Sequence, residues 1–250
     1  MKPGEIGTRG PAVAAAFDRA ADSYDRLVAA NPGYQQHLRS SARRMCLPGS
    51  GSGLRLLDAG CGTGASTAAL LAVYPQAEIV GMDASAQMLA RAREKSWPES
   101  VRFAHAPIES LTDSGVRGPF DGIFAGYLIR NLADPDAQLR AMRALLRPGG
   151  ALAVHEYSVR DSRLARATWH AVCCGVIIPT GLAATGDAAL FRYLRRSVAE
   201  FDGVGRFRRR LLEAGFTGVR TATMTGWQRR IVHTFVAERP IEPGRGRDER

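Results

Sequence analysis

The chain has 250 residues, of which 45% are hydrophobic and 23% are charged, and it carries a formal net charge of +10. These values are ordinary for a globular protein, and the length suits one large α/β domain that can bury a full core. We expect no signal peptide, because the first residues lack an apolar segment, and no run reaches the roughly 18 apolar residues of a membrane span. The four cysteines form no C-x-x-C pair and no metal spacing with histidine, so we expect reduced thiols, no metal site and a cytoplasmic protein.

The chain opens with a segment that is expected to be helical. Residues 1–10 are predicted to be disordered, and apolar residues three or four apart then predict helices between residues 11 and 48. We expect a single domain over residues 11–238 and a polar tail over residues 239–250.

Residues 54–64 read LRLLDAGCGTG and predict the centre of the fold. A short apolar run ended by glycines indicates a buried parallel strand entering a tight loop, and residues 65–71 indicate the following helix. Gly60, Gly62 and Gly64 would let the backbone approach a ligand closely, while the helix start offers unpaired N–H groups. The stretch therefore predicts a cofactor loop.

Two cofactors fit this loop. Gly60, Gly62 and Ala65 satisfy the dinucleotide pattern G-x-G-x-x-G/A, so the glycine spacing alone leaves a nicotinamide open. Asp58 favours another cofactor, because a carboxylate at the strand end repels a pyrophosphate and attracts an ammonium group. The segment DAGCGTG resembles motif I of the class I S-adenosyl-L-methionine-dependent methyltransferases. That cofactor carries an ammonium, a sulfonium and no phosphate, and Cys61 would be a small space-filling residue beside it.

A second strand is predicted over residues 77–83 and ends in Asp83, 23 residues after Gly60. This spacing suits a carboxylate that accepts hydrogen bonds from ribose hydroxyls, and Ser85 is available as the N-cap of the next helix. A third strand is predicted over residues 101–105, and Pro107 stands where many relatives carry Asp or Asn. The resemblance implies the following cofactor-binding residues: Tyr24, Asp58, Gly60, Cys61, Gly62, Gly64, Asp83, Ala84, Met88, Ile108 (through its backbone N–H) and Glu109.

A fourth strand over residues 119–125 and a fifth over residues 151–158 are predicted to end beside the cofactor loop, because ligands of open α/β sheets bind at the carboxyl ends of strands. Arg130 follows the fourth strand and could stabilise a developing phenolate or form a structural ion pair. Glu156 ends the fifth strand, where a general base or a cation stabiliser would stand. His155 and Glu156 should point to opposite faces of that strand.

Three segments resemble the UbiE/MenG-type quinone C-methyltransferases. Residues 17–25 match the opening F-D-x-x-A-x-x-Y-D, a helix that lies over the cofactor in that family. Arg130 and Asn131 match its F-G-x-R-N segment. Residues 147–158 match K-P-G-G-x-L-x-x-x-E-x-S, with arginine in place of lysine and His155 in place of an aliphatic residue. The resemblance implies that Glu156, Arg130, His155 and Tyr127 are the catalytic candidates.

The rest of the chain completes the expected fold. Residues 160–200 leave the sheet as a helical lid with an apolar run over residues 171–179, and a helix is predicted over residues 203–214. Strands are predicted over residues 216–224 and 227–237. The resemblance implies a Rossmann-like class I methyltransferase fold of the α/β class, a seven-stranded, mostly parallel sheet with its last strand antiparallel and helices on both faces.

The resemblance also implies the reaction. We expect methyl transfer from S-adenosyl-L-methionine to carbon of a quinol, a phenol or a prenylated small molecule, and hence a small hydrophobic aromatic or isoprenoid acceptor. An enzyme of specialised metabolism that methylates O, N or an isoprenoid carbon stays open. From other classes, a non-catalytic cofactor-binding protein and an RNA-binding protein are the alternatives. A monomer and a homodimer both stay open.

Ten arginines and three acidic residues lie in residues 191–230, a local net charge of +7. Solvated helix faces and contact with an anionic membrane surface both account for such a region, and nucleic acid is less favoured. A nucleic-acid surface would interleave aromatic side chains with the arginines, whereas Phe201 and Phe207 have the spacing of a helix core. We therefore expect no specific nucleic acid and keep open a peripheral contact with the inner face of a membrane.

Overall fold

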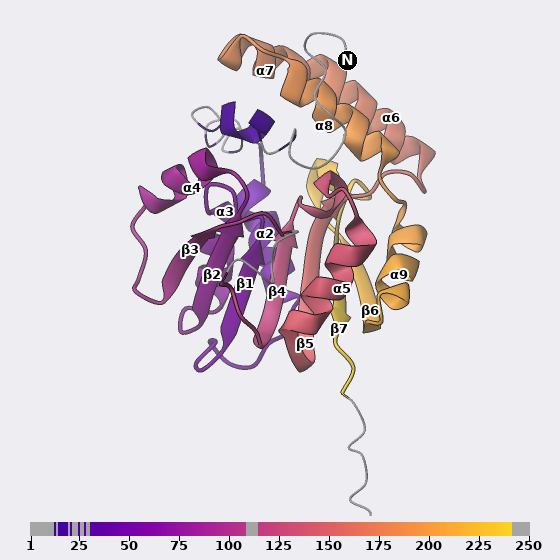
Figure 1. The fold of residues 1–250 in the computed structure, drawn as a ribbon. Helices are drawn as coiled ribbons and strands as arrows, with labels where there is room; N and C mark the ends of the chain where they lie inside the picture. The colour runs from indigo at the N-terminus through magenta and orange to yellow at the C-terminus, as the bar shows by residue number, and fades with distance from the viewer. Residues whose placement is uncertain are drawn as a thin grey trace, which may run out of the picture.

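Seven strands form one sheet in the order β3-β2-β1-β4-β5-β7-β6 in the computed structural model of the chain (Figure 1). The structure describes residues 13, 15–19, 21, 25, 28, 31–108 and 115–241. The strands are β1 (Arg55–Ala59), β2 (Glu78–Asp83), β3 (Val101–His105), β4 (Phe120–Gly126), β5 (Leu146–Tyr157), β6 (Thr217–Thr223) and β7 (Val232–Glu238).

In the described part of the chain, five helices cover the sheet, and a further helical layer lies above the ends of its strands. On the sheet lie α2 (Tyr34–Arg43), α3 (Ala65–Val73), α4 (Ala86–Arg93), α5 (Pro135–Leu145) and α9 (Val204–Glu213). Above it lie α6 (Arg163–Val172), the π-helix η3 (Cys173–Ile177), α7 (Ile178–Thr185) and α8 (Ala189–Glu200). Short 3-10 turns are η2 (Ile129–Asn131) and η4 (Gly226–Gln228).

The pairing of the strands fixes the fold class. β1 pairs in parallel with β2 and β4, β2 with β3, and β4 with β5. β7 runs antiparallel between β5 and β6. The expected Rossmann-like order of the class I methyltransferases, with the last strand reversed, is confirmed.

Both faces of the sheet are buried. Neighbouring residues of a strand point to opposite faces, so each central strand contributes side chains to both apolar clusters. In β4, Ile123 belongs to the apolar cluster that includes Phe207 of α9, whereas Phe124 belongs to the cluster that includes Leu38 of α2 and Leu70 of α3. The central strands are therefore packed on both faces, and this packing fixes the positions of the side chains at their carboxyl ends.

A third apolar cluster joins the upper helical layer to the sheet. Tyr157 at the end of β5 and Val232 at the start of β7 lie in it together with Trp169 of α6, Cys173 of η3 and Val198 of α8. Figure 1 shows α6, α7 and α8 as a layer above the sheet. This cluster positions the layer over the strand ends that carry the candidate site.

Strand β5 begins earlier than the residue pattern indicates. The pattern predicts a strand over residues 151–158, whereas β5 begins at Leu146. Leu146 is fully buried and pairs with Phe120, and a register shift then brings Ala151 opposite Gly122. The exposed residues between them form an irregular, bulged start to the strand, which a Pro-Gly-Gly sequence does not reveal.

Strand β7 begins later than predicted. The pattern indicates a strand over residues 227–237, whereas Trp227 lies in η4 and β7 starts at Val232. Gln228 of this turn is fully buried, and its Oε1 lies 2.6 Å from Nδ1 of His37 on α2. A contact between residues 191 positions apart thus holds the turn, and no local pattern can predict it.

Candidate active site and cofactor site

The glycine loop after β1 is shaped by its backbone. Gly60, Gly62 and Gly64 all have positive φ angles, and the N–H groups of Gly60 and Cys61 donate to the Met82 carbonyl of β2. A Cβ on Gly62 would meet no atom within 4 Å, so the backbone faces open space there. The loop can therefore approach a ligand at Gly62, as the sequence predicts.

Asp58 ends β1 as a fully buried carboxylate. Its Oδ2 accepts hydrogen bonds from Ser66 Oγ at 2.7 Å and Thr67 Oγ1 at 2.6 Å, while its Oδ1 has no partner among the described residues. Burial raises the pKa of Asp58 to about 7, although the two hydroxyls oppose this rise and Asp83 adds to it. A buried acceptor without a partner is costly, so a cationic ligand group would satisfy it.

Asp83 joins the end of β2 to the glycine loop. Its Oδ2 accepts the Gly62 N–H at 2.7 Å, and its Oδ1 accepts the Ser85 N–H at 2.8 Å. Burial raises the pKa of this carboxyl and the backbone N–H groups lower it again. Ser85, rather than Asp83, caps α4, since its side chain accepts the Met88 N–H. Asp83 thus keeps lone pairs free for a ligand beside the loop.

The remaining predicted cofactor residues lie around these two acids. Cys61 is buried, and burial raises the pKa of its thiol well above the usual range. Met88 and Ile108 are also buried, and the Ala84 carbonyl accepts a hydrogen bond from His105. Tyr24 and Glu109 lie outside the described residues.

Two further acids reach the cofactor loops from the N-terminal segment. Asp18 accepts hydrogen bonds from Ser85 Oγ and the Gln87 N–H of α4. Asp25 accepts from Thr63 Oγ1 of the glycine loop and pairs with Lys95 Nζ at 2.7 Å. Asp18 and Asp25 are not among the site residues predicted from the sequence. Their spacing of seven residues, about two turns of a helix, is the signal in the sequence that would place them on one helical face.

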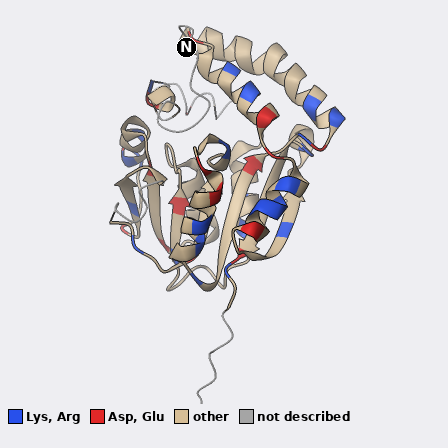
Figure 2. Ribbon diagram, turned by 45° about the vertical axis from the view of Figure 1, so that its right-hand side comes forward, with Lys and Arg blue, Asp and Glu red and all other residues tan. Residues whose placement is uncertain are grey.

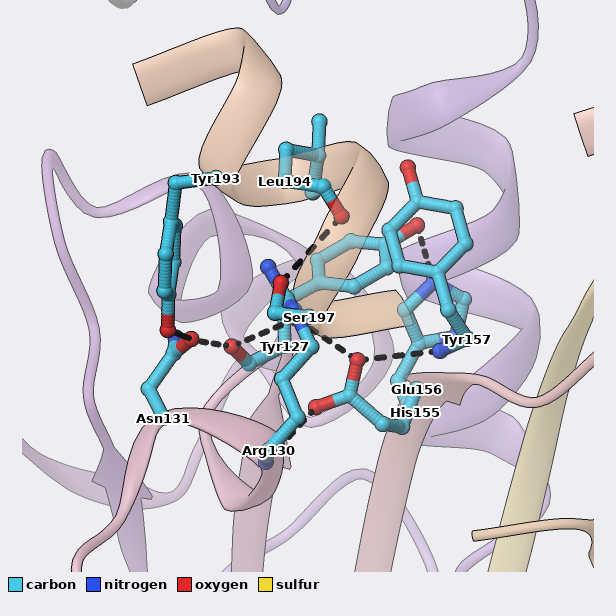
Figure 3. A network of polar contacts seen from close by, with 9 residues as sticks. All are labelled: Tyr127, Arg130, Asn131, His155, Glu156, Tyr157, Tyr193, Leu194 and Ser197. Carbon is cyan, nitrogen blue, oxygen red and sulfur yellow. Dashed lines mark hydrogen bonds and ion pairs between the residues drawn. The ribbon is translucent and has the colours of Figure 1, made fainter. Parts of the chain in front are cut away.

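Arg130 and Glu156 form a buried ion pair at the ends of β4 and β5 (Figure 3). Arg130 Nη1 donates to Glu156 Oε1 at 2.7 Å, and the two side chains are only 5% and 0% exposed. The Tyr157 N–H donates to the same oxygen. Burial raises the pKa of Glu156, while Arg130 works against that rise. The Glu156 carboxylate therefore accepts its hydrogen bonds from groups of the protein itself. Arg130 Nε has no partner among the described residues.

Tyr127 and His155 form a second pair on the other face of β5. Tyr127 Oη lies 3.0 Å from His155 Nε2, and His155 Nδ1 lies 2.7 Å from Ser41 Oγ of α2. Ser41 in turn contacts Thr234 of β7, whose hydroxyl accepts from Arg44 at 2.6 Å. Burial lowers the pKa of His155 to about 3, so the imidazole is neutral. A neutral imidazole between two hydroxyls can fix the orientation of the Tyr127 hydroxyl.

Tyr127 also connects the site to the helical layer. It has a left-handed φ of 55°, which is uncommon outside glycine, and its carbonyl accepts hydrogen bonds from Arg130 and Asn131. Tyr193 of α8 donates to Asn131 Oδ1 at 2.7 Å, as Figure 3 shows. A left-handed conformation persists in such a residue where the surrounding structure imposes it. At this position it turns the Tyr127 side chain towards His155.

The structure thus brings the four catalytic candidates together at the carboxyl ends of the neighbouring strands β4 and β5. The cofactor acids stand at the ends of β1 and β2, and the catalytic candidates stand at the ends of β4 and β5. Leu128, which follows β4, packs closely on Gly60: a Cβ added to Gly60 would lie 2.9 Å from Cδ1 of Leu128. The two halves are therefore neighbours, and the geometry can hold a cofactor and an acceptor side by side.

Comparisons with known proteins agree on the family. A sequence model of the ubiE/COQ5 methyltransferase family matches residues 6–234. The ubiquinone/menaquinone biosynthesis C-methyltransferase UbiE of Syntrophotalea carbinolica is 34% identical over 216 residues, which cover 84% of this chain and 88% of that protein. The demethylmenaquinone methyltransferase of Staphylococcus aureus is 30% identical over 213 residues, which cover 84% and 87%.

Solved structures share the fold at lower identity. The cyclase SpnF superposes with a TM-score of 0.68 at 18% identity and covers 95% of this chain and 99% of its own. A likeness at this identity shows the fold alone, and the name of this neighbour indicates that the same fold also supports cyclisation. The reaction must therefore be argued from family membership and from the site.

Proposed function

We propose that this chain, which belongs to the ubiE/COQ5 methyltransferase family, methylates a ring carbon of a quinol, a phenol or a related prenylated small molecule. It is an S-adenosyl-L-methionine-dependent methyltransferase, and its acceptor is a small molecule. The names of its relatives support a quinone acceptor. The observation that carries the proposal is the neutral Tyr127–His155 pair beside the glycine loop.

The cofactor half of the site fits the family's cofactor. The unpartnered Oδ1 of Asp58 suits its ammonium group, and Asp83 suits its ribose hydroxyls. The backbone at Gly62 would lie against it, and Ala84, Met88 and Ile108 would line its adenine side. When bound, the cofactor supplies an electrophilic methyl group on a sulfonium. The residues of the chain then hold the acceptor in line with that methyl, which is a matter of proximity and orientation.

The acceptor half supplies hydrogen bonds to the reacting oxygen. Loss of the phenol proton to solvent raises the nucleophilicity of the ring carbons. Tyr127 Oη, which accepts a hydrogen bond from Nε2 of the neutral His155, is placed to donate to the developing phenolate. Ser41 Oγ donates to His155 Nδ1, so the imidazole stays neutral in its buried site.

Arg130 and Glu156 take different roles in this proposal. The unpartnered Nε of Arg130 can donate to a developing phenolate. Among the described residues, Glu156 accepts hydrogen bonds only from Arg130 and from the backbone N–H groups of Arg130 and Tyr157, so it acts as a positioning residue that holds the guanidinium in place. The buried pair adds no net charge, which suits an aromatic acceptor.

A second function has one observation in its favour. His155 stands where the quinone family usually has an aliphatic residue, and it positions the Tyr127 hydroxyl. An enzyme of specialised metabolism that methylates O, N or an isoprenoid carbon would use the same Tyr127–His155 pair. Peripheral contact with a membrane is also part of the proposal.

The test is product analysis. Purified protein is incubated with S-adenosylmethionine and demethylated quinols that carry short prenyl chains, and the product is analysed by mass spectrometry and NMR. We expect a ring methyl group, and Tyr127→Phe should lower kcat about tenfold or more, because the developing phenolate loses a hydrogen-bond donor, without weakening cofactor binding. An O-methyl product would favour the second function, and full activity of Tyr127→Phe would contradict the role of Tyr127.

A further inference from the structure

The upper helical layer carries a long apolar stretch. Residues 163–185 form one continuous helical run through α6, η3 and α7, with a mean hydropathy of 1.4 in its most apolar window, of which only 17% is buried. Among the described residues this is the one helix whose length and composition would allow it to cross a membrane. A helix so apolar and yet so exposed requires an explanation.

One side of this run is already occupied. Ala165, Trp169 and Cys173, spaced by four, are buried, and Trp169 and Cys173 belong to the cluster that contains Val198 of α8. Gly181 of α7 lies against the Phe191 ring of α8. Because this stripe is packed on the body of the protein, the helix cannot be surrounded by lipid on all sides. It can lie on a bilayer but not span it.

The opposite side is exposed and apolar. Val176 and Leu182 are 56% and 47% exposed, and Leu164 is 70% exposed. The sequence holds no Asp, Glu, Lys or Arg between residues 171 and 186. Of the five most exposed large hydrophobic side chains in the described part of the chain, these three lie on this run. We call the exposed side of residues 171–186 the lid face.

The helices that carry and support the lid face have a net positive charge. Residues 160–200 contain six arginines and three acidic residues, a net charge of +3. Arg163 and Arg166 are exposed at the start of α6, and Arg192 is exposed on α8. Figure 2 shows basic segments on the helices above the sheet. Arg210 of α9 pairs with Asp202, and Arg220 of β6 pairs with Glu238. Arg163, Arg166 and Arg192 lie on the same helical layer as the lid face.

We propose that the lid face binds the surface of an anionic lipid bilayer. An exposed apolar helix face with arginines at its border matches the boundary between acyl chains and anionic headgroups. Val176 and Leu182 would enter the acyl region, while Arg163, Arg166 and Arg192 would contact the headgroups. This docking surface does not depend on the methyl acceptor, and it moves the membrane contact from residues 191–230 as a whole to the lid.

The test is co-sedimentation of the whole protein with vesicles. Wild-type protein should bind vesicles of phosphatidylglycerol and phosphatidylcholine more tightly than vesicles of phosphatidylcholine alone. The double variant Val176→Glu/Leu182→Glu should lose about tenfold or more in affinity, because two charges would have to enter the acyl boundary. Leu212→Glu on α9 is the matched control, since Leu212 is 54% exposed and lies away from the lid face.

Charge is tested separately. Arg163→Gln/Arg166→Gln should remove most of the preference for phosphatidylglycerol, and added salt should do the same to wild-type protein. Titration with S-adenosylhomocysteine reports whether each variant is folded. Absence of vesicle binding by wild-type protein, or equal loss in Leu212→Glu, would overturn the proposal. So would a wild-type dimer that ignores vesicles and that Val176→Glu/Leu182→Glu converts to monomers, because a second copy would then cover the lid face.

Discussion

Asp58 at the end of β1 and Glu156 near the end of β5 are both fully buried carboxylates, but their neighbours differ. Asp58 contacts two hydroxyl groups, and one of its oxygens has no partner in the described part of the chain. Glu156 is matched by the guanidinium of Arg130. The site around Asp58 thus lacks an internal cation, which a ligand can supply, whereas the site around Glu156 is neutralised by the chain itself.

The largest effect is expected when the internal cation, Arg130, is removed. Arg130→Met would leave Glu156 buried without its partner, and such losses lower the free energy of unfolding by about 3–5 kcal/mol. Urea unfolding of cofactor-free protein measures the change. Asp58→Asn is the matched control and should cost less than about 1 kcal/mol, because Asp58 has no internal cation to lose. Equal losses in both variants would contradict the distinction between the two halves.

The next effect concerns the cofactor. Asp58→Ala and Asp83→Ala should each weaken the binding of S-adenosylhomocysteine about ten- to a hundredfold, since each removes a charged hydrogen-bond partner. Calorimetric titration gives the dissociation constants. Glu78→Ala, at the exposed opposite end of the same strand as Asp83, should bind normally. Unchanged binding in both aspartate variants would overturn the assignment of these residues.

The raised pKa of Asp58 predicts a pH dependence. Below pH 7 the carboxyl is protonated in the cofactor-free protein, and it must lose that proton to pair with an ammonium group. Affinity for S-adenosylhomocysteine should therefore fall as the pH falls from 7 to 5, by up to about tenfold per pH unit. Titration of Asp58→Asn over the same range should give a flatter profile. In cofactor-free protein the sign reverses: this group lowers stability as the pH rises from its unfolded value of 3.8 towards 7.

The smallest expected effect lies in the N-terminal segment. Asp25 and Lys95 are 46% and 39% exposed, and exposed pairs contribute about 0–1 kcal/mol. Asp25→Asn should therefore raise the dissociation rate of S-adenosylhomocysteine by about fivefold at most, measured by stopped-flow fluorescence. Loss of binding as large as in Asp83→Ala would show that the segment carries the site rather than covering it.

The sequence predicts the cofactor half better than the acceptor half because their contacts differ in range. Asp58 meets Ser66 and Thr67 eight and nine residues later, within one strand–loop–helix unit that the glycine pattern identifies. Arg130 meets Glu156 only because β4 and β5 are neighbours, a fact about sheet order. The lid shows the same limit: its apolar run is visible in the sequence, but which face is packed depends on α8.

The hydrogen-bond chain behind Tyr127 depends on both ends of the described fold. His155 contacts Ser41 of α2, and Ser41 contacts Thr234 of β7, which is inserted between β5 and β6. During synthesis, β1 to β4 and the glycine loop leave the ribosome well before β7 does. The glycine loop can therefore fold before the hydrogen-bond chain that orients Tyr127 is complete.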